Sequence, residues 1–225
     1  MHEVHRDVLF EVFGLPVTSH VTTMWAIMAV FILIAVLSTR NLKKVPGRLQ
    51  NLVEFVLESL LNFFSGILGP EKARRYFPLL ATFFLFILFS NWSGLLPGAG
   101  HVKGFKPPTS TVSVTAGLAV VSFFATQIAG FREKGWRYLK HFIEPIPIFL
   151  PLTIIEELVK PLSLALRLYG NIYGEETVVA VLFSLAPYFS PIPMQMLGIL
   201  FGFIQALVFT TLAAIYIANA TAEAH

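Results

Sequence analysis

The chain has 225 residues, of which 56% are hydrophobic, and its formal net charge is +3. Charged residues make up 13% of the chain, about half of their share in a typical water-soluble domain. This composition excludes a water-soluble globular domain and indicates a polytopic membrane protein, with residues 1–225 forming a single membrane domain. The basic residues stand in loops beside apolar segments, which indicates a role in membrane topology and no nucleic-acid partner. The absence of cysteine excludes disulfides and thiolate metal sites.

Residues 1–20 form a short polar segment that lacks the basic start and apolar core of a cleavable signal peptide. Its histidines are spaced too loosely to favour a metal site over a surface or interfacial position. Residues 21–39 are apolar and form the first predicted span. A basic run that begins at Arg40 follows this span. It predicts that this end is cytoplasmic and that the N-terminus lies outside.

Residues 47–68 differ from the spans, because apolar residues recur at helical spacing on one face while polar residues take the other. The pattern predicts an amphipathic helix that lies along the cytoplasmic surface or packs on a partner. The charged stretch Glu71–Arg75 is interpreted as a second cytoplasmic loop, and residues 77–96 as the second span.

Residues 111–129 form the third predicted span, after an outer loop that is rich in glycine and proline. The hydroxyls of Thr111 and Ser113 at its start are interpreted as helix caps, with the lining of a channel mouth as the alternative. The stretch Phe131–His141 then forms a third basic loop.

Two long helical regions complete the chain, at residues 142–186 and 192–219. Both exceed the ~20 residues that an upright helix needs to cross a membrane, so we expect them to be tilted. The outer segments hold only three basic residues, whereas the predicted cytoplasmic loops hold Arg40, Lys43, Lys44, Arg48, Lys72, Arg74, Arg75, Arg132, Lys134, Arg137 and Lys140. This bias predicts about five membrane-embedded helices, with the C-terminus cytoplasmic.

Charged and polar side chains interrupt the first of these two regions. They are Glu156, Glu157, Lys160, Arg167, Asn171, Glu175 and Glu176. Since a charged side chain at the centre of a membrane costs at least ~2.5 kcal/mol, such residues mark a functional site. At about 100° per residue, Glu156, Lys160 and Asn171 fall on the same side of a helix as Arg167. Pro161 is expected to disturb this helix.

Each residue type in this stretch suits a different task. An arginine guanidinium stays charged at physiological pH, so Arg167 supplies a fixed positive field that favours the ionised form of a nearby carboxylate. Burial tunes the pKa of a glutamate into the range that a proton relay needs. The relay candidates are Glu156, Glu157 and Glu176. The amides of Asn171 and of Gln205, in the last helix, can hold Arg167 or order water.

The segment KPLSLALRLYGN at Lys160–Asn171 resembles the core motif of subunit a of the F-type ATP synthase, the stator protein that faces the rotating c-ring. The ending of the second span, Asn91–Pro97, is similar to that family as well. The resemblance implies an all-α polytopic membrane protein with one amphipathic surface helix and with the last two helices tilted against the c-ring. It implies two proton half-channels that couple ion flow to rotary ATP synthesis.

The resemblance also implies the partners: the c-ring, the peripheral-stalk subunit b, other ATP synthase subunits and the lipid bilayer of a bacterial plasma (inner) membrane. It implies no cofactor and no catalytic site on this chain. The sequence agrees, since it holds no P-loop, dinucleotide fingerprint or nucleophile triad, and the adjacent Glu175 and Glu176 cannot share one helix face.

The family's functional residues fall on Arg167, Asn171, Glu176 and Gln205. Two positions depart from the family pattern, because Glu175 stands where a small residue is common and Gly198 where some members carry histidine. Thr111 and Ser113 likewise stand where the family usually carries aspartate and asparagine.

Other interpretations stay open at this point. A self-contained secondary transporter would use Arg167 to bind an anionic substrate, and it would show an inverted repeat, which the sequence lacks. A purely structural membrane anchor would not require buried charge. Glu156 and Glu157 could form packing ion pairs, Lys160 could reach the interface with its ammonium group, and Gln205 could link helices. The choice between proton and sodium also stays open.

Overall fold

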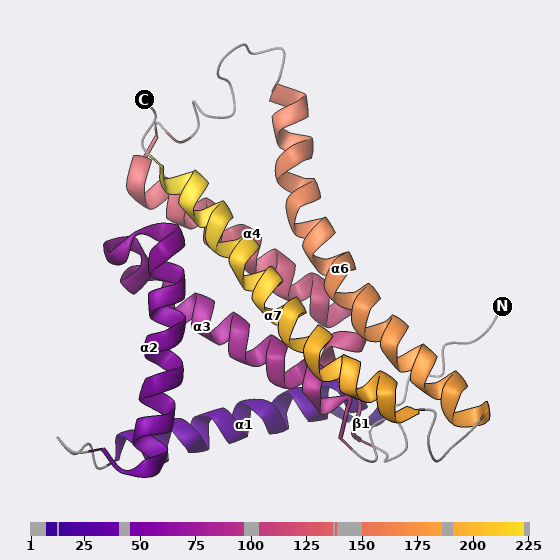
Figure 1. Ribbon diagram of the computed structural model, residues 1–225. Helices are drawn as coiled ribbons and strands as arrows, with labels where there is room; N and C mark the ends of the chain where they lie inside the picture. Colours follow the sequence, from indigo (N-terminus) through magenta and orange to yellow (C-terminus); the bar gives the residue numbers. More distant parts are fainter. Residues whose placement is uncertain are drawn as a thin grey trace.

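The computed structural model describes residues 8–12, 14–40, 46–96, 104–136, 138, 150–185 and 191–222. The helices are α1 (Ser19–Thr39), α2 (Arg48–Leu68), α3 (Pro70–Ser93), α4 (Val112–Lys134), α6 (Leu150–Leu185) and α7 (Pro191–Thr221), with a short 3-10 helix η1 (Pro108–Ser110). The strands β1 (Val8–Val12) and β2 (Leu15–Thr18) form an antiparallel hairpin ahead of α1 (Figure 1).

Five of the described helices are long and apolar enough to cross a membrane: α1, α2, α3, α4 and residues 192–221 of α7. The remaining long helix, α6, is the one that carries the charged residues from Glu156 to Glu176. The predicted fold class, an all-α polytopic membrane protein, is confirmed.

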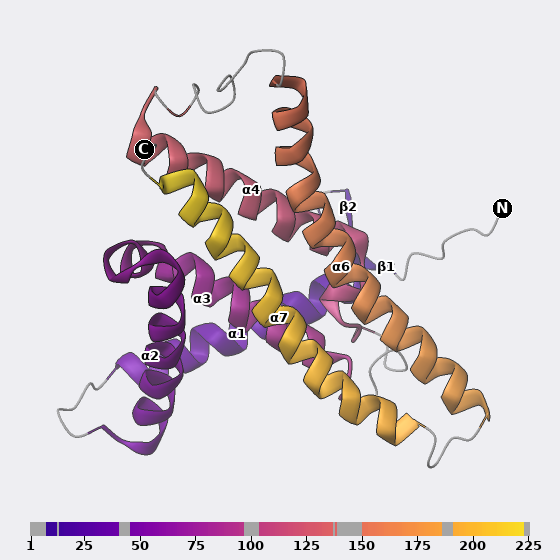
Figure 2. The same ribbon diagram turned by 45° about the horizontal axis from the view of Figure 1, so that its top comes forward.

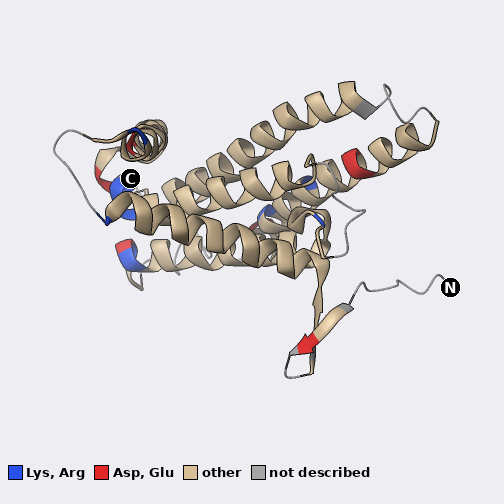
Figure 3. Cartoon of the chain, turned by 90° about the horizontal axis from the view of Figure 1, so that it is seen from below, with Lys and Arg blue, Asp and Glu red and all other residues tan. Residues whose placement is uncertain are grey.

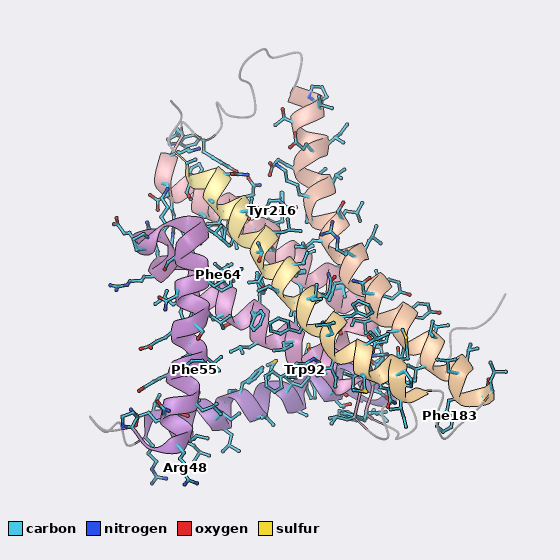
Figure 4. All side chains as sticks on the ribbon, in the orientation of Figure 1. Arg48, Phe55, Phe64, Trp92, Phe183 and Tyr216 are labelled. Carbon is cyan, nitrogen blue, oxygen red and sulfur yellow. The ribbon has the colours of Figure 1, made fainter. Side chains whose placement is uncertain are left out.

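The helix α2 differs from the others in its direction. It runs across one end of the bundle that α3, α4 and α7 form, and Figure 3 shows it nearly end-on while the others run lengthwise. Its buried positions Leu60, Phe64 and Leu68 recur at helical spacing. Phe64 lies on the bundle side in Figure 4. Polar residues, among them Glu54 and Glu58, are exposed, as an amphipathic helix requires.

The core forms where α3, α7 and α6 meet. Its fully buried members include Leu80 and Ile87 of α3, Leu168 of α6 and Phe209 of α7. The rings of Phe83 and Phe209 meet edge to face with centroids 5.7 Å apart, which is a favourable arrangement for two aromatic rings. By contrast, α1 leaves most of its apolar side chains exposed, with Ile32 at 62%. This is the pattern of a helix that faces lipid.

The charged stretches 71–75 and 132–134 lie inside helices, so their interpretation as loops was wrong. Gly69, with φ of 79°, ends α2, and Pro70 begins α3 directly after it, as its fixed φ and missing N–H favour. The charged stretch Glu71–Arg75 therefore forms the first turns of α3. Similarly, Arg132 and Lys134 belong to the last turn of α4. There they complement the negative end of the helix dipole.

The basic residues gather at one end of the bundle, where α1, α4 and α7 finish and α3 begins (Figure 3). Lys72 of α3 donates to the backbone oxygen of Thr221 at the end of α7 over 2.7 Å. Arg75 pairs with Glu133 of α4. These contacts tie the ends of three helices together.

At the opposite end, the first turns of α1 hold the segment before η1. The His20 imidazole donates to the Pro107 carbonyl over 2.9 Å, and the Thr22 hydroxyl donates to the Gly104 carbonyl over 2.7 Å. The β-hairpin also lies at this end. It was not expected from the sequence.

The helices α6 and α7 run in opposite directions as neighbours (Figure 2). Pro161 lies inside α6, which is continuous from Leu150 to Leu185 and bends along its length in Figure 1. Residues 142–149 of the predicted long region lie outside the described residues. Thr111 precedes α4, but its hydroxyl donates to the Pro108 carbonyl and accepts no N–H from the helix. The predicted cap is therefore absent at Thr111.

Candidate functional site

The helix α6 has one buried face and one open face. Leu164, Leu168 and Ile172 recur every four residues and are buried against the rest of the bundle. Arg167 and Gly170 lie on the open face, and a side chain added at Gly170 would meet only open space. Small residues let a second helix approach closely, and Gly170 leaves such room on this face.

Arg167 lies on the exposed side of α6. It is exposed, and it makes no hydrogen bond or ion pair with any residue that the structure describes. Tyr216 of α7 lies within electrostatic range of the guanidinium. A charged side chain at membrane depth faces water, a counter-ion or the inside of a helix bundle, which makes the surroundings of Arg167 the candidate site.

Asn171 and Gln205 form the central link between α6 and α7. The Asn171 amide nitrogen Nδ2 donates to Gln205 Oε1 over 2.7 Å. Gln205 is only 3% exposed, and its Nε2 has no partner among the described residues. Asn171 follows Arg167 by four residues, about one helical turn along α6. The structure therefore brings together two of the residues that the sequence singled out.

Glu175 and Glu176 are half-buried beyond this link. The carboxylate of Glu175 lies against Gly198 of α7, where a Cβ would overlap it. Leu95 lies against the same glycine. Glu175 therefore faces the interior of the helix pair.

A group of buried polar atoms lies near the same end of the bundle. The oxygens Ser90 Oγ, Asn91 Oδ1 and Thr109 Oγ1 have no partner among the described residues. Asn91 Nδ2 donates to the Gly202 carbonyl and Trp92 Nε1 to the Ile199 carbonyl, each over 3.0 Å (Trp92 is labelled in Figure 4). Buried polar atoms without protein partners commonly bind ordered water.

The neighbouring residues Glu156 and Glu157, in the first half of α6, have different surroundings. Lys160 Nζ lies 2.6 Å from Glu157 Oε1 and 3.4 Å from Glu156 Oε1. The Glu156 side chain is 66% exposed, on the open face with Arg167, whereas that of Glu157 is 16% exposed. Gln127 of α4 donates to Glu157 Oε2 over 3.1 Å. The predicted polar stripe of Glu156, Lys160, Arg167 and Asn171 thus exists, with Glu157 turned inward.

Sequence analysis missed Gln127 and Tyr138, which contact each other and Glu157. Gln127 is the one amide within α4, and a lone glutamine in an apolar span is a signal that could have identified it. Nothing in the sequence around Tyr138 indicated its position.

These features define a multi-pass α-helical membrane protein. Its longest described helix carries an exposed arginine that has no ion-pair partner among the described residues. The family profile for the ATP synthase A chain matches residues 21–218. The chain is 51% identical over 210 residues to ATP synthase subunit a 1 of Syntrophotalea carbinolica, covering 92% of this chain and 87% of that protein. It is 45% identical over 220 residues to ATP synthase subunit a of Moorella thermoacetica, covering 97% and 98%.

The chain therefore belongs to the ATP synthase subunit a family, whose members are membrane subunits of the ATP synthase complex.

Proposed function

We propose that this chain conducts protons between the two sides of the membrane through two half-channels that meet at the c-ring, and so couples ion flow to rotation. The observation that carries the proposal is Arg167, which is exposed on α6 without a counter-ion among the described residues. A rotating ring of carboxylates would supply a succession of transient counter-ions. Each carboxylate would lose its proton as it approaches the fixed guanidinium.

The outer half-channel runs, in this proposal, through the interior of the α6 and α7 pair. Glu175 and Glu176 are half-buried there, and the partnerless oxygens of Ser90, Asn91 and Thr109 provide sites for ordered water. Water and carboxylates in sequence form a path along which a proton can move. The hydroxyl and amide groups take the place of the aspartate and asparagine that the family usually carries at the start of α4.

The inner half-channel follows the open face of the first half of α6. Glu156, which precedes Arg167 in α6 and shares its exposed face, lines this path. The bonded amides of Asn171 and Gln205 stand between the two groups of glutamates. Because neither amide titrates and Arg167 repels protons, a direct leak from one half-channel to the other is obstructed.

The remaining proposals concern partners and placement. The open face of α6 contacts the c-ring, and the exposed side of α2 lies along the cytoplasmic surface, where subunit b and other ATP synthase subunits bind. The basic end of the bundle is cytoplasmic, by the excess of lysine and arginine. The N-terminus is then outside and the C-terminus cytoplasmic, in a bacterial plasma membrane.

Cross-linking in the assembled complex tests the orientation of α6, and a chain without native cysteine suits it. Leu166 is exposed beside Arg167, while Leu168 is fully buried. Leu166→Cys is expected to form a disulfide with a cysteine on the outer helix of the c-ring, and Leu168→Cys to form none. Assembled complexes in which neither position reacts, or in which the isolated chain alone transports an anionic solute, would contradict the proposal.

A further inference from the structure

A turn after α4 folds Tyr138 back onto that helix. Gly135, with φ of 56°, donates its N–H to the Phe131 carbonyl over 2.8 Å and ends the helix. The Tyr138 N–H then donates to the Gly135 carbonyl over 3.1 Å. The Tyr138 ring lies on Gly130, where any Cβ would overlap it. The backbone therefore directs the phenol toward the turn of α4 that carries Gln127.

From that position a continuous set of hydrogen bonds crosses from α4 to α6. The Tyr138 hydroxyl donates to Gln127 Oε1 over 2.8 Å. Gln127 Nε2 donates to Glu157 Oε2 over 3.1 Å, and Lys160 Nζ donates to Glu157 Oε1 over 2.6 Å. Gln127 accepts through Oε1 from Tyr138 and donates through Nε2 to Glu157, and these two bonds fix the orientation of its amide group.

Glu157 is thereby held with a donor on each carboxylate oxygen, and its side chain is largely buried. The pKa of Tyr138 is raised to about 12, mainly by burial and to a smaller extent by the negative charge of Glu157. The phenol therefore keeps its proton at physiological pH and can donate it to Gln127 Oε1. Glu156, the neighbour in sequence, is mostly exposed, and among the described residues its carboxylate has the Lys160 ammonium at 3.4 Å as its one charged partner.

We infer that Glu157 is a fixed counter-ion for Lys160, that Gln127 and Tyr138 are its positioning residues, and that only Glu156 of the two glutamates exchanges protons. The inference rests on the proposed function, because the proton exchange assigned to Glu156 is part of that function. Lys160 precedes Arg167 by seven residues, about 10 Å along the same side of the helix. Without a counter-ion, its ammonium group would add a second positive charge to the face that Arg167 presents to the rotor.

A compensation experiment in inverted membrane vesicles with the assembled complex tests the counter-ion. E157Q leaves an amide opposite the Lys160 ammonium, and ATP-driven acidification is expected to fall on the order of fivefold. E157Q combined with K160Q forms a neutral pair and is expected to recover to within about twofold of the parent. If E157Q lowers the amount of assembled subunit, adding K160Q should restore that amount as well. Normal pumping by E157Q, or a defect that K160Q leaves unchanged, would overturn the inference, since a proton carrier is not restored by removing a neighbouring charge.

A second pair of variants tests the positioning residues. Tyr138→Phe and Gln127→Leu are each expected to lower acidification about two- to fivefold, because each removes one bond of the series. Combined with E157Q, neither should lower it further, since residues of one network are not additive. The matched control is Tyr76→Phe, whose hydroxyl is buried without a partner in the described part of the chain and should have no effect. Independent, additive losses would contradict positioning.

The failure of this inference is separable from failure of the proposed function. Arg167→Ala in the same vesicles reports on the function alone: if it pumps normally, the proposed function is wrong. If Arg167→Ala abolishes pumping while E157Q is not rescued by K160Q, the function stands and the counter-ion assignment falls.

Discussion

The carboxylate of Glu175 in α6 occupies the space that a side chain at position 198 of α7 would need. Sequence analysis registered these as two separate departures from the family pattern, an acid in place of a small residue and a glycine in place of histidine. In the fold they are one arrangement, because the absent side chain of Gly198 makes room for the acid of Glu175.

Substituting Gly198 should therefore disturb Glu175 directly. In Gly198→Ala the new methyl group overlaps the carboxylate and approaches Leu95, and overpacking of this kind costs about 1–3 kcal/mol. We expect reduced ATP-driven acidification by inverted vesicles, with recovery when Glu175→Gly restores the space. Gly117→Ala in α4 is the control, because a Cβ there meets nothing within 4 Å. A defect equal in both variants would point to a general loss of assembly.

The bond between Asn171 and Gln205 is expected to contribute to cohesion of the helix pair. Asn171→Ala leaves both polar atoms of the buried Gln205 amide without a described partner, at a cost of about 1–3 kcal/mol. Replacing Gln205 by leucine in the same chain removes the orphaned group and should recover part of that loss. The thermal midpoint of the detergent-solubilised complex measures both steps. If the double variant is less stable than Asn171→Ala, the link is not the source of the loss.

The long apolar helices were predicted well from the sequence, because a membrane span requires a long apolar run whatever packs beside it. It placed the start of α3 seven residues late, since the charged residues after Pro70 looked like a loop, whereas Gly69 and Pro70 set the boundary through backbone geometry. The polar stripe around Arg167 followed from helical spacing alone. The partners Gln127 and Tyr138 did not, because contacts between distant segments depend on packing that periodicity does not encode.

A core substitution should separate packing within the chain from contact with lipid. Phe209 is fully buried and packs on Phe83, whereas Ile32 is mostly exposed on α1. Phe209→Ala is expected to destabilise the complex by about 2 kcal/mol, below the ~3–5 kcal/mol of water-soluble cores. The cost is smaller because the apolar contacts of a membrane protein are compared with contacts to lipid and not with exposure to water. Ile32→Ala should change the thermal midpoint little. Equal effects would place Phe209 outside the core.

The open face of α6 offers a test of contact with the rotor in which no charged residue is changed. A Cβ at Gly170 meets nothing within 4 Å, so a leucine side chain there starts in open space, and leucine favours a helix over glycine by about 1 kcal/mol. The subunit should therefore be present at parental levels in the membrane, but acidification should fall because the close approach beside Arg167 is blocked. Gly66→Leu, at another exposed helical glycine with open space, serves as the control. Normal pumping by Gly170→Leu would show that no helix packs there.

The central claim is that Arg167 couples ion movement to rotation and blocks a direct leak. Its most direct test records ATP-driven acidification and passive proton leak together, in inverted vesicles that contain the assembled complex with Arg167→Ala. The account predicts that acidification is lost while assembly is normal, and that passive leak increases. Normal acidification would contradict the claim and return the self-contained transporter as the better explanation of an arginine at this depth.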